Sequence, residues 1–282
     1  MTFTDEPVKV LTIAGSDSGG AVGLQADLRT FAALGAHGLC GVTVVTAQNS
    51  WGVTAVHALP PPFLAAQLDA VFSDYATVGD GIGAVKTGFL ARVELIEQVA
   101  AKLSEYNARN IVVDPVLVNY QGVPMFPLEV VAAYREKLLP LATAVSPNRH
   151  ELLLLTGQKP QAELTLVQAE TAVLRLHTLG PRTVLAKGLR DGATMVDLFY
   201  DGHEMTQLRF PWLPTDNRKG SGDTLSAALA VFLARGIGKK TAVLHAHQFT
   251  QTALAHAANW QIGHGAGPLA HWLTAPKEQG MA

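Results

Sequence analysis

The sequence contains very little cysteine and few charged residues, and both shortages exclude whole classes of protein. Cys40 is the only cysteine in 282 residues, so the chain can form neither an intrachain disulfide nor a cysteine-based metal cluster. Charged residues make up only 16% of the chain, and its 21 basic and 23 acidic side chains include no basic block. We therefore expect neither a nucleic acid nor an anionic membrane as a partner.

Long apolar runs and the common nucleotide-binding fingerprints are also missing. No run approaches the roughly 18 apolar residues of a membrane span, and residues 1–9 lack the basic-then-apolar pattern of a signal peptide. We therefore expect a cytoplasmic protein. The sequence has no Walker A motif, and the glycine loop at residues 15–23 does not match Gly-x-Gly-x-x-Gly. A P-loop and a Rossmann dinucleotide site are therefore not expected.

The chain does contain enough apolar residues for a large core, at 48% of its length, and they alternate between strand and helix patterns. The pattern predicts strands at residues 8–14, 40–46, 84–86, 111–113, 144–146 and 183–188, separated by helices at 24–34, 63–72, 93–103, 128–138, around 151–155 and 164–179. Residues 196–200 and 207–210 are typical of an antiparallel hairpin, and helices follow residue 223 and span 241–260. No linker or repeat interrupts the chain. We predict one domain over residues 1–282, a three-layer α/β/α fold with a mostly parallel central sheet and a few late antiparallel strands.

Polar residues and glycine stand at the carboxyl ends of the predicted strands. In such sheets, ligands bind outside the carboxyl ends of the strands. The residues at these positions are Gly15, Gln48, Lys86, Asp114, Asn148 and Lys187. We expect them to form one wall of a binding site.

A glycine turn at Gly220-Ser221-Gly222-Asp223 opens the helix after residue 223. Glycine lets the backbone approach a ligand, and the free amides of a helix start attract anions. Asp223 is a poor phosphate ligand but a suitable base for a hydroxyl that attacks phosphate. The alternative is that Asp223 only caps the helix.

Several motifs occur in an order that resembles a known kinase family. They are Ala14-Gly15-Ser16-Asp17, Gln25-Ala26-Asp27-Leu28, Thr46-Ala47-Gln48-Asn49, Val113-Asp114-Pro115-Val116, Ser146-Pro147-Asn148-Arg149-His150-Glu151, Lys187-Gly188 and the Gly220–Asp223 turn. Together they resemble the hydroxymethylpyrimidine/phosphomethylpyrimidine kinases of thiamine biosynthesis, a branch of the ribokinase-like fold close to the pyridoxal kinases. The resemblance implies a homodimeric, Mg²⁺-dependent enzyme that transfers phosphate from ATP to a small aminopyrimidine, 4-amino-5-hydroxymethyl-2-methylpyrimidine. Whether the monophosphate is a second substrate stays open.

The resemblance also implies roles for residues around the transferred phosphate and the substrate ring. Asp223 would be the catalytic base, and Gly220, Ser221 and Gly222 would form an anion hole. Gln48 would bind the aminopyrimidine edge, because a primary amide matches its donor and acceptor. Asp27 would contact the substrate near its hydroxyl, and Gly15 would let the ring approach the backbone. The alternatives are that Gln48 bonds its own loop and that Asp27 lies on a solvated helix face.

Four further residues are implied to hold ATP and Mg²⁺. Lys187 would lie near the phosphates, with a solvent-exposed lysine as the alternative. Asn148 and Glu151 match an Asn-x-x-Glu motif that holds Mg²⁺ and its waters beside the nucleotide, and Asp114 would assist. The same spacing also fits a capping box at a helix start, and the two interpretations are compatible.

Two departures from the pyrimidine-kinase pattern keep pyridoxal kinase as the alternative function. The family often has Cys where this chain has Asp223, and its Met-Val-Ala-Lys-Ser-Gly loop is replaced here by residues 117–122, which lack the lysine. His245 and His247 lie two positions apart on a predicted helix, so they point to different faces and are not expected to share a ligand.

Overall fold

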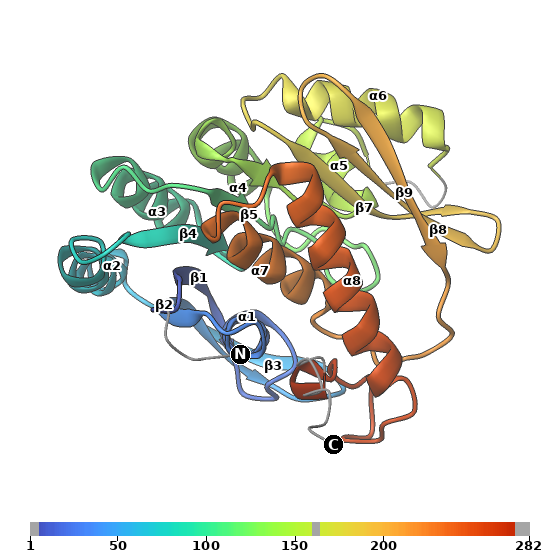
Figure 1. The fold of residues 1–282 in the computed structure, drawn as a ribbon, viewed down its shortest axis with the longest axis horizontal. Coiled ribbons are helices and arrows are strands. Elements are labelled where there is room, and N and C mark those ends of the chain that lie inside the picture. Colours follow the sequence, from blue (N-terminus) through green and yellow to red (C-terminus); the bar gives the residue numbers. More distant parts are fainter. Residues whose placement is uncertain (1–5, 160–163, 274–282) are drawn as a thin grey trace, which may run out of the picture.

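The computed structural model describes residues 6–159 and 164–273, whose nine strands form a single sheet (Figure 1). The strands are β1 (Lys9–Asp17), β2 (His37–Gln48), β3 (Val53–Ala58), β4 (Ile82–Thr87), β5 (Ile111–Val113), β6 (Ala144–Val145), β7 (Val184–Asp191), β8 (Thr194–Tyr200) and β9 (Met205–Pro211). Their order across the sheet is β3-β2-β1-β4-β5-β6-β7-β8-β9. The six strands from β2 to β7 in this order pair in parallel, whereas β8 and β9 pair antiparallel.

Helices cover both faces of the sheet, as expected for a three-layer fold. They are α1 (Gly23–Ala33), α2 (Pro61–Tyr75), α3 (Val93–Glu105), α4 (Leu128–Ala133), α5 (Arg149–Leu155), α6 (Leu166–His177), α7 (Ser221–Ala234) and α8 (Lys239–Ala257). Buried residues of α2 to α6 join one hydrophobic cluster, and those of α1, α7 and α8 join the other. Alternate residues of β5 face opposite clusters: Ile111 and Val113 face the first, and Val112 the second. The predicted layers are therefore confirmed.

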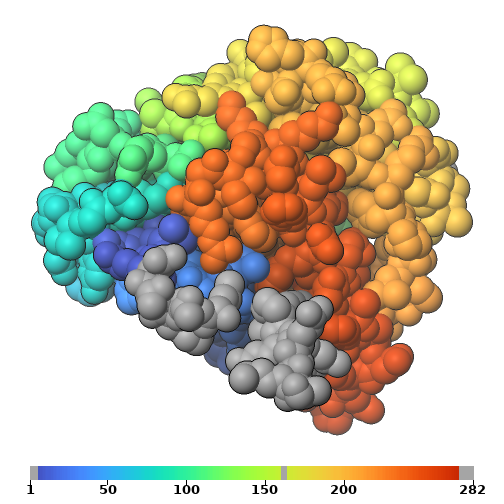
Figure 2. All heavy atoms as spheres, in the orientation of Figure 1, coloured from blue at the N-terminus to red at the C-terminus, as the bar shows by residue number. Residues whose placement is uncertain are grey.

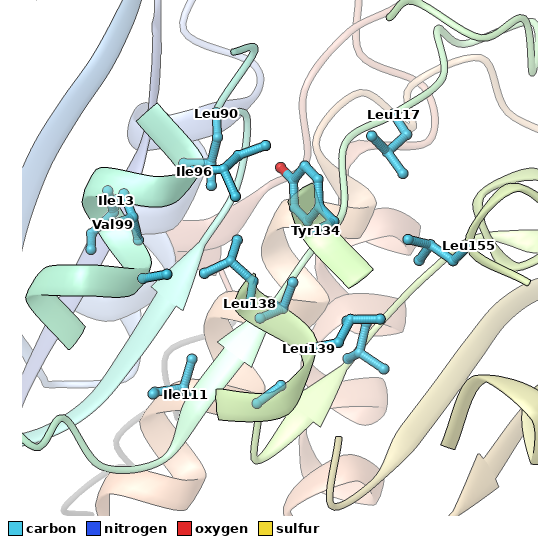
Figure 3. Packing of buried hydrophobic residues seen from close by; sticks show 14 of the residues in the cluster. Ile13, Leu90, Ile96, Val99, Ile111, Leu117, Tyr134, Leu138, Leu139 and Leu155 are labelled. Atoms are coloured by element: carbon cyan, nitrogen blue, oxygen red, sulfur yellow. The ribbon is translucent and has the colours of Figure 1, made fainter. Parts of the chain in front are cut away.

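The larger cluster packs around Tyr134, which is 1% exposed (Figure 3). A buried tyrosine needs a partner for its hydroxyl, and the Tyr134 hydroxyl donates to the carbonyl of Gly88, 3.2 Å away. Here the predicted helix at 128–138 changes to a π-helix over Tyr134–Leu138. The hydrogen bond from Tyr134 anchors Gly88, just after β4, at the edge of the sheet where ligands are expected.

The sequence pattern missed β3, so antiparallel pairing is not confined to the late strands. β3 returns antiparallel to β2 across the expected turn at residues 49–52 and forms one edge of the sheet. Five of its six residues are exposed. An edge strand without a buried face has no hydrophobic alternation, which explains why the pattern did not indicate it.

Helix α7 begins at Ser221, four residues before the predicted helical run at Leu225. Asp223 therefore lies inside the first helical turn.

Figure 2 shows that the C-terminal third of the chain, in orange to red, covers the centre of the viewed face. None of the helices at residues 6–159 and 164–273 combines the length and apolar character that a membrane crossing demands.

Candidate active site

The glycine turn before α7 is held in a conformation that only glycine adopts easily. Gly220 has φ 83°, and a Cβ there would lie 2.1 Å from the carbonyl oxygen of Ala21 in the loop after β1. A Cβ on Gly222 would lie 3.1 Å from the Nζ of Lys187, which lies inside β7 because that strand continues to Asp191, beyond its predicted end at residue 188. The two glycines thus bring the start of α7 against the loop after β1 and against Lys187 of β7.

The first amides of α7 are the donors that the predicted anion hole would use, but the amide of Ser221 already has a partner. The first N–H groups of a helix have no partner within the helix and carry its positive dipole end. The N–H of Ser221 donates to the carbonyl of Arg218, 3.1 Å away. The amides of Gly222 and Asp223 therefore fit an anion better than that of Ser221, whose hydroxyl remains a donor.

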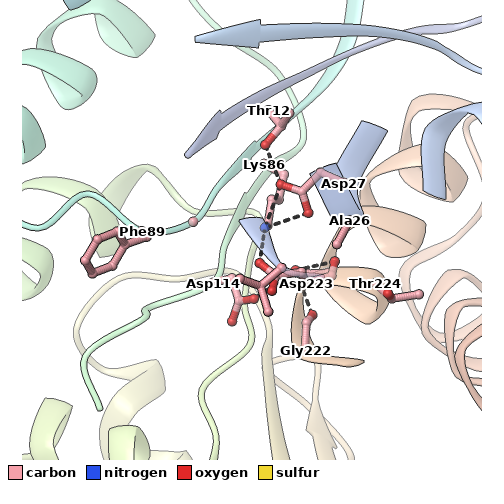
Figure 4. Close-up of polar contacts among 12 residues, drawn as sticks. Thr12, Ala26, Asp27, Lys86, Phe89, Asp114, Gly222, Asp223 and Thr224 are labelled. Atoms are coloured by element: carbon pink, nitrogen blue, oxygen red, sulfur yellow. Dashed lines mark hydrogen bonds and ion pairs between the residues drawn. The ribbon is translucent and has the colours of Figure 1, made fainter. Parts of the chain in front are cut away.

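Asp223 meets a fully buried lysine that also binds Asp27 (Figure 4). The Nζ of Lys86 lies 3.1 Å from Asp223 Oδ1 and 2.8 Å from each oxygen of Asp27. The hydroxyl of Thr12 donates to Asp27 Oδ2 at 2.6 Å. Asp27 is 0% exposed, so the alternative of a solvated helix face is wrong. The side chain of Asp223 is 15% exposed and is the only member of this three-residue ionic cluster (Asp27, Lys86 and Asp223) that reaches solvent.

Burial and charge shift the ionisation of this cluster. Burial is the largest effect on Asp27 and, together with the negative charge of Asp223, raises its pKa to about 7 against the opposing effect of Lys86. Burial alone would lower the pKa of Lys86, but Asp27 and Asp223 outweigh it and raise that pKa above its usual range. Lys86 is therefore a permanent cation shared by two carboxylates. The sequence pattern placed Lys86 at the end of a strand but gave it no specific role. A lysine in a mostly apolar parallel strand was the feature that could have indicated a buried ion pair.

A second ionic group, formed by Lys187 and Asp114, lies beside the glycine turn. The Nζ of Lys187 is 2.8 Å from Asp114 Oδ1, and the hydroxyl of Ser226 in α7 donates to Asp114 Oδ2 at 3.0 Å. Burial acts to raise the pKa of Asp114, but Lys187 and Lys86 outweigh it and hold that pKa below its usual value. Lys187 is thus paired rather than solvated, and its ammonium lies beside Gly222.

Asn148 and Glu151 form the capping box that the sequence allowed. Asn148 Oδ1 accepts from the N–H of Glu151 at 3.1 Å, and Glu151 Oε2 accepts from the N–H of Asn148 at 2.9 Å. The other oxygen of Glu151 accepts from the N–H of Leu117 at 3.2 Å. Burial, and then Asp114, raise the pKa of Glu151 to about 8.

The carboxylates near the glycine turn are too few to hold Mg²⁺ alone, but they fit Mg²⁺ that is also bound by phosphate oxygens and waters. In the described ranges, no group of three or more His, Cys, Asp or Glu side chains is close enough to hold a metal by itself. Mg²⁺ is usually held by one or two carboxylates together with waters and substrate phosphates. Asp114 and Glu151 can supply those carboxylates, and a nearby cation would favour the ionised form of Glu151.

A cavity of about 310 Å³ joins the residues expected to bind the nucleotide. Asn148, Lys187, Ser221 and Gly222 line one part of it. The rest is mostly apolar or aromatic, with Met195, Phe210, Pro211, Trp212, Leu213, Leu225 and Leu254 among the lining residues. His247 also lines it, with its Nε2 3.0 Å from Asp197 Oδ2, whereas His245 packs on Phe232, so the two histidines do separate as expected. The cavity is thus polar beside the glycine turn and apolar farther away.

The predicted substrate residues Gln48 and Gly15 lie on the opposite side of the turn. Gln48 ends β2 and is half-buried, and in the described part of the chain its amide makes one long contact, 3.4 Å from the Thr46 hydroxyl. The amide can therefore bind a ligand with little rearrangement. Gly15 has a packing reason to be glycine, because a Cβ would lie 2.8 Å from Val44 Cγ2 and 3.1 Å from Phe89 Cδ1.

A C-terminal arm (residues 261–273) contacts both the turn after Gln48 and the first turn of α7, and no sequence pattern predicted it. Gly265 N–H donates to the hydroxyl of Ser50 at 3.0 Å, beside the turn after Gln48. Lys219 reaches the carbonyl of the same Ser50 at 2.5 Å. His271 Nε2 lies 2.8 Å from the hydroxyl of Thr224, next to Asp223. The arm thus contacts both walls of the site.

Comparison with known proteins agrees with this geometry. The phosphomethylpyrimidine kinase family model matches residues 17–270. The chain is 42% identical to the hydroxymethylpyrimidine/phosphomethylpyrimidine kinase of Synechococcus elongatus, over 93% of this chain and 96% of that protein. It is 40% identical to the chloroplastic thiamine biosynthetic bifunctional enzyme of Arabidopsis thaliana, over 99% of this chain. The chain spans about half the length of that enzyme, 53%, and of a bifunctional thiamine biosynthesis protein from Geobacter sulfurreducens, 52%.

Solved structures support the same fold. The pyridoxal kinase of Staphylococcus aureus in complex with AMP-PCP and pyridoxal matches with a TM-score of 0.83 and 32% identity, over 95% of this chain and 94% of that one. The Synechococcus protein is named as a kinase of hydroxymethylpyrimidine and phosphomethylpyrimidine, and the Staphylococcus protein as a kinase of pyridoxal. Because the family match covers most of the sequence, the chain belongs to the phosphomethylpyrimidine kinase family, on the ribokinase-like fold it shares with pyridoxal kinases.

Proposed function

We propose that this chain transfers the γ-phosphoryl group of ATP to the hydroxymethyl group of 4-amino-5-hydroxymethyl-2-methylpyrimidine in thiamine biosynthesis. One observation carries the proposal: Asp223 is the solvent-reaching carboxylate at the anion-binding start of α7, between the nucleotide cavity and the Gln48 side. ATP use is supported by the AMP-PCP complex of the related pyridoxal kinase. That the protein is cytoplasmic and forms a homodimer stays a prediction.

In this mechanism Asp223 accepts the proton of the substrate hydroxyl as its oxygen attacks the γ-phosphorus. The amides of Gly222 and Asp223 stabilise negative charge on the transferring group, and Lys187 lies beside them. Mg²⁺, held by Asp114 and Glu151 through waters and phosphate oxygens, would neutralise the β- and γ-phosphates when bound. Asp27 is fully buried, so we propose that it acts through Lys86 rather than by touching the substrate.

The purified protein should produce ADP when it is incubated with ATP, Mg²⁺ and the aminopyrimidine. Pyridoxal is tested in parallel, because pyridoxal kinase is the alternative function. Absence of ADP with both compounds would refute a kinase of hydroxymethyl heterocycles.

The aminopyrimidine should have the higher kcat/KM of the two. One edge of the aminopyrimidine has a hydrogen-bond donor and an acceptor, and the Gln48 amide can pair with both. Pyridoxal can satisfy only part of the hydrogen-bonding capacity of that amide. A buried polar group left unpaired costs about 1–3 kcal/mol, which corresponds to a preference of about 5- to 150-fold. Steady-state kinetics with both acceptors at one Mg·ATP concentration measures the ratio. Equal values, or a preference for pyridoxal, would favour the alternative function.

Gln48→Ala should weaken binding of the aminopyrimidine by about 1–3 kcal/mol, because two hydrogen bonds to the ring edge are lost. The affinity for ATP should hardly change, since the described nucleotide cavity lies on the other side of the glycine turn. Calorimetric titration with each ligand measures both effects. Gln207→Ala is the matched control, since that glutamine is exposed on β9. Unchanged pyrimidine affinity in Gln48→Ala would show that the ring binds elsewhere.

A further inference from the structure

The charge around Asp223 bears on which acceptor this site can use. Relatives of the chain are named for two acceptors, the hydroxymethylpyrimidine and its monophosphate. We propose that Asp223 makes this chain selective for the alcohol, so that it phosphorylates the hydroxymethylpyrimidine far faster than the monophosphate. This selectivity rests on the proposed function and specifies it further.

The two acceptors need different chemistry from the same position. An alcohol must lose its proton as the new oxygen–phosphorus bond forms and the bond from the γ-phosphorus to ADP breaks, and Asp223 receives that proton. A phosphate monoester near pH 7 carries about −1.5 to −2 charge and attacks through an oxygen that is already ionised. It has no proton to give, so a base at residue 223 contributes nothing to its reaction. The carboxylate would instead face a second anion at close range.

The nearby lysines do not compensate for this repulsion, because carboxylates already bind them. Lys86 lies 3.1 Å from Asp223 and 2.8 Å from both oxygens of Asp27, so one ammonium serves two carboxylates. Lys187 lies 2.8 Å from Asp114. These five side chains therefore combine two cations with three carboxyl groups. An incoming phosphate finds no lysine of this group without a counter-ion.

The other titratable side chains around the turn are held by the loops that flank it. The guanidinium of Arg29 donates to the carbonyl of Gly20, and the ammonium of Lys219 binds the carbonyls of Asn49 and Ser50. The guanidinium of Arg218, which lines the cavity, donates to the carbonyl of Thr215 and stacks over the ring of Trp212. His271 contacts Thr224, and burial lowers its pKa to about 4, so it adds no positive charge near neutral pH. The carboxylate of Asp223 is therefore the feature of this site that separates the two acceptors.

The test compares kcat/KM for the hydroxymethylpyrimidine and for its monophosphate, with ATP and Mg²⁺, in the wild type and in Asp223→Ser. The wild type should prefer the alcohol by at least about 100-fold, the lower end of what a positioned base contributes. Asp223→Ser should lose about 10²- to 10⁴-fold on the alcohol but keep or increase its rate on the monophosphate. The preference should then largely disappear. Asp216→Asn is the control, because it removes an exposed carboxylate seven residues upstream and should leave the preference unchanged.

Binding separates this inference from the proposed function. The monophosphate should bind Asp223→Asn at least about tenfold more tightly than the wild type in calorimetric titration, whether or not turnover occurs. Turnover of the alcohol without any preference over the monophosphate, or equal monophosphate binding by wild type and Asp223→Asn, would overturn the selectivity. Absence of turnover with the alcohol would refute the proposed function, and the binding comparison would still decide the role of the Asp223 charge.

Discussion

Asp223→Asn should lower kcat by about 10²- to 10⁴-fold, the usual contribution of a positioned base, while KM for both substrates changes little. Asparagine has nearly the same shape and can still place an oxygen near Lys86, so the first turn of α7 should keep its geometry. It cannot accept the hydroxyl proton. Steady-state and single-turnover kinetics with the aminopyrimidine measure the loss and separate chemistry from product release.

The competing role for Asp223 is that of a negative charge at a helix start. Such a charge stabilises a helix by about 0.3–1 kcal/mol and would affect the free energy of unfolding, not turnover. Denaturant titration of Asp223→Asn measures that contribution. Near-normal turnover together with slightly reduced stability would show that Asp223 is only part of the helix start.

Lys86→Met should lower both the free energy of unfolding and kcat, and the loss of stability should be among the largest for a single change in this chain. The substitution leaves the fully buried Asp27 without its cation. Removing one partner of a buried ion pair typically costs about 3–5 kcal/mol, because the remaining charge is uncompensated. Turnover should fall as well, since Asp223 loses the ammonium that fixes its side chain 3.1 Å away. Chemical denaturation and kinetics at matched folded fractions separate the two effects.

A double variant distinguishes the structural role of Lys86 from its role at the site. Asp27→Asn with Lys86→Met removes both buried charges, so most of the lost stability should return, as with other buried pairs replaced together. Turnover should remain low, because Asp223 is still without its partner. Recovery of both stability and full turnover would reduce Lys86 to a structural residue. Lys102→Met is the control, since its partner Asp69 is 43% exposed and such pairs contribute at most about 1 kcal/mol.

The sequence predicted most of the fold because each parallel strand and its helix carries a local signal. Buried parallel strands are short apolar runs, and the helices between them bury one face, so periodicity alone located both. The strand β3 gave no such signal because nearly all of it is exposed. The start of α7 at Ser221 was not predicted because Gly220 and Gly222 lie on either side of it. Glycine is a poor helix former inside a helix, but here Gly220 is the N-cap and Gly222 lies in the first turn.

Local features of the candidate site could be predicted from the sequence, whereas features that depend on tertiary contacts could not. Asn148 and Glu151 lie three positions apart, and their capping box could be read directly from that spacing. Lys86 and Asp27 are 59 positions apart, and only the sheet order β1-β4 shows that the lysine reaches α1 beneath the glycine turn. The C-terminal arm has no motif of its own, and its contacts to Ser50 and Thr224 exist only in the folded chain.

Those contacts of the arm set an order of events during protein synthesis. The strands and helices up to α8 can pair and pack as they leave the ribosome, but the turn after Gln48 stays without its bond from Gly265, and Thr224 without His271, until residues 261–273 have emerged. A nascent chain that still lacks the arm therefore has its strands and helices but leaves Ser50 and Thr224, on two sides of the proposed active site, without these contacts.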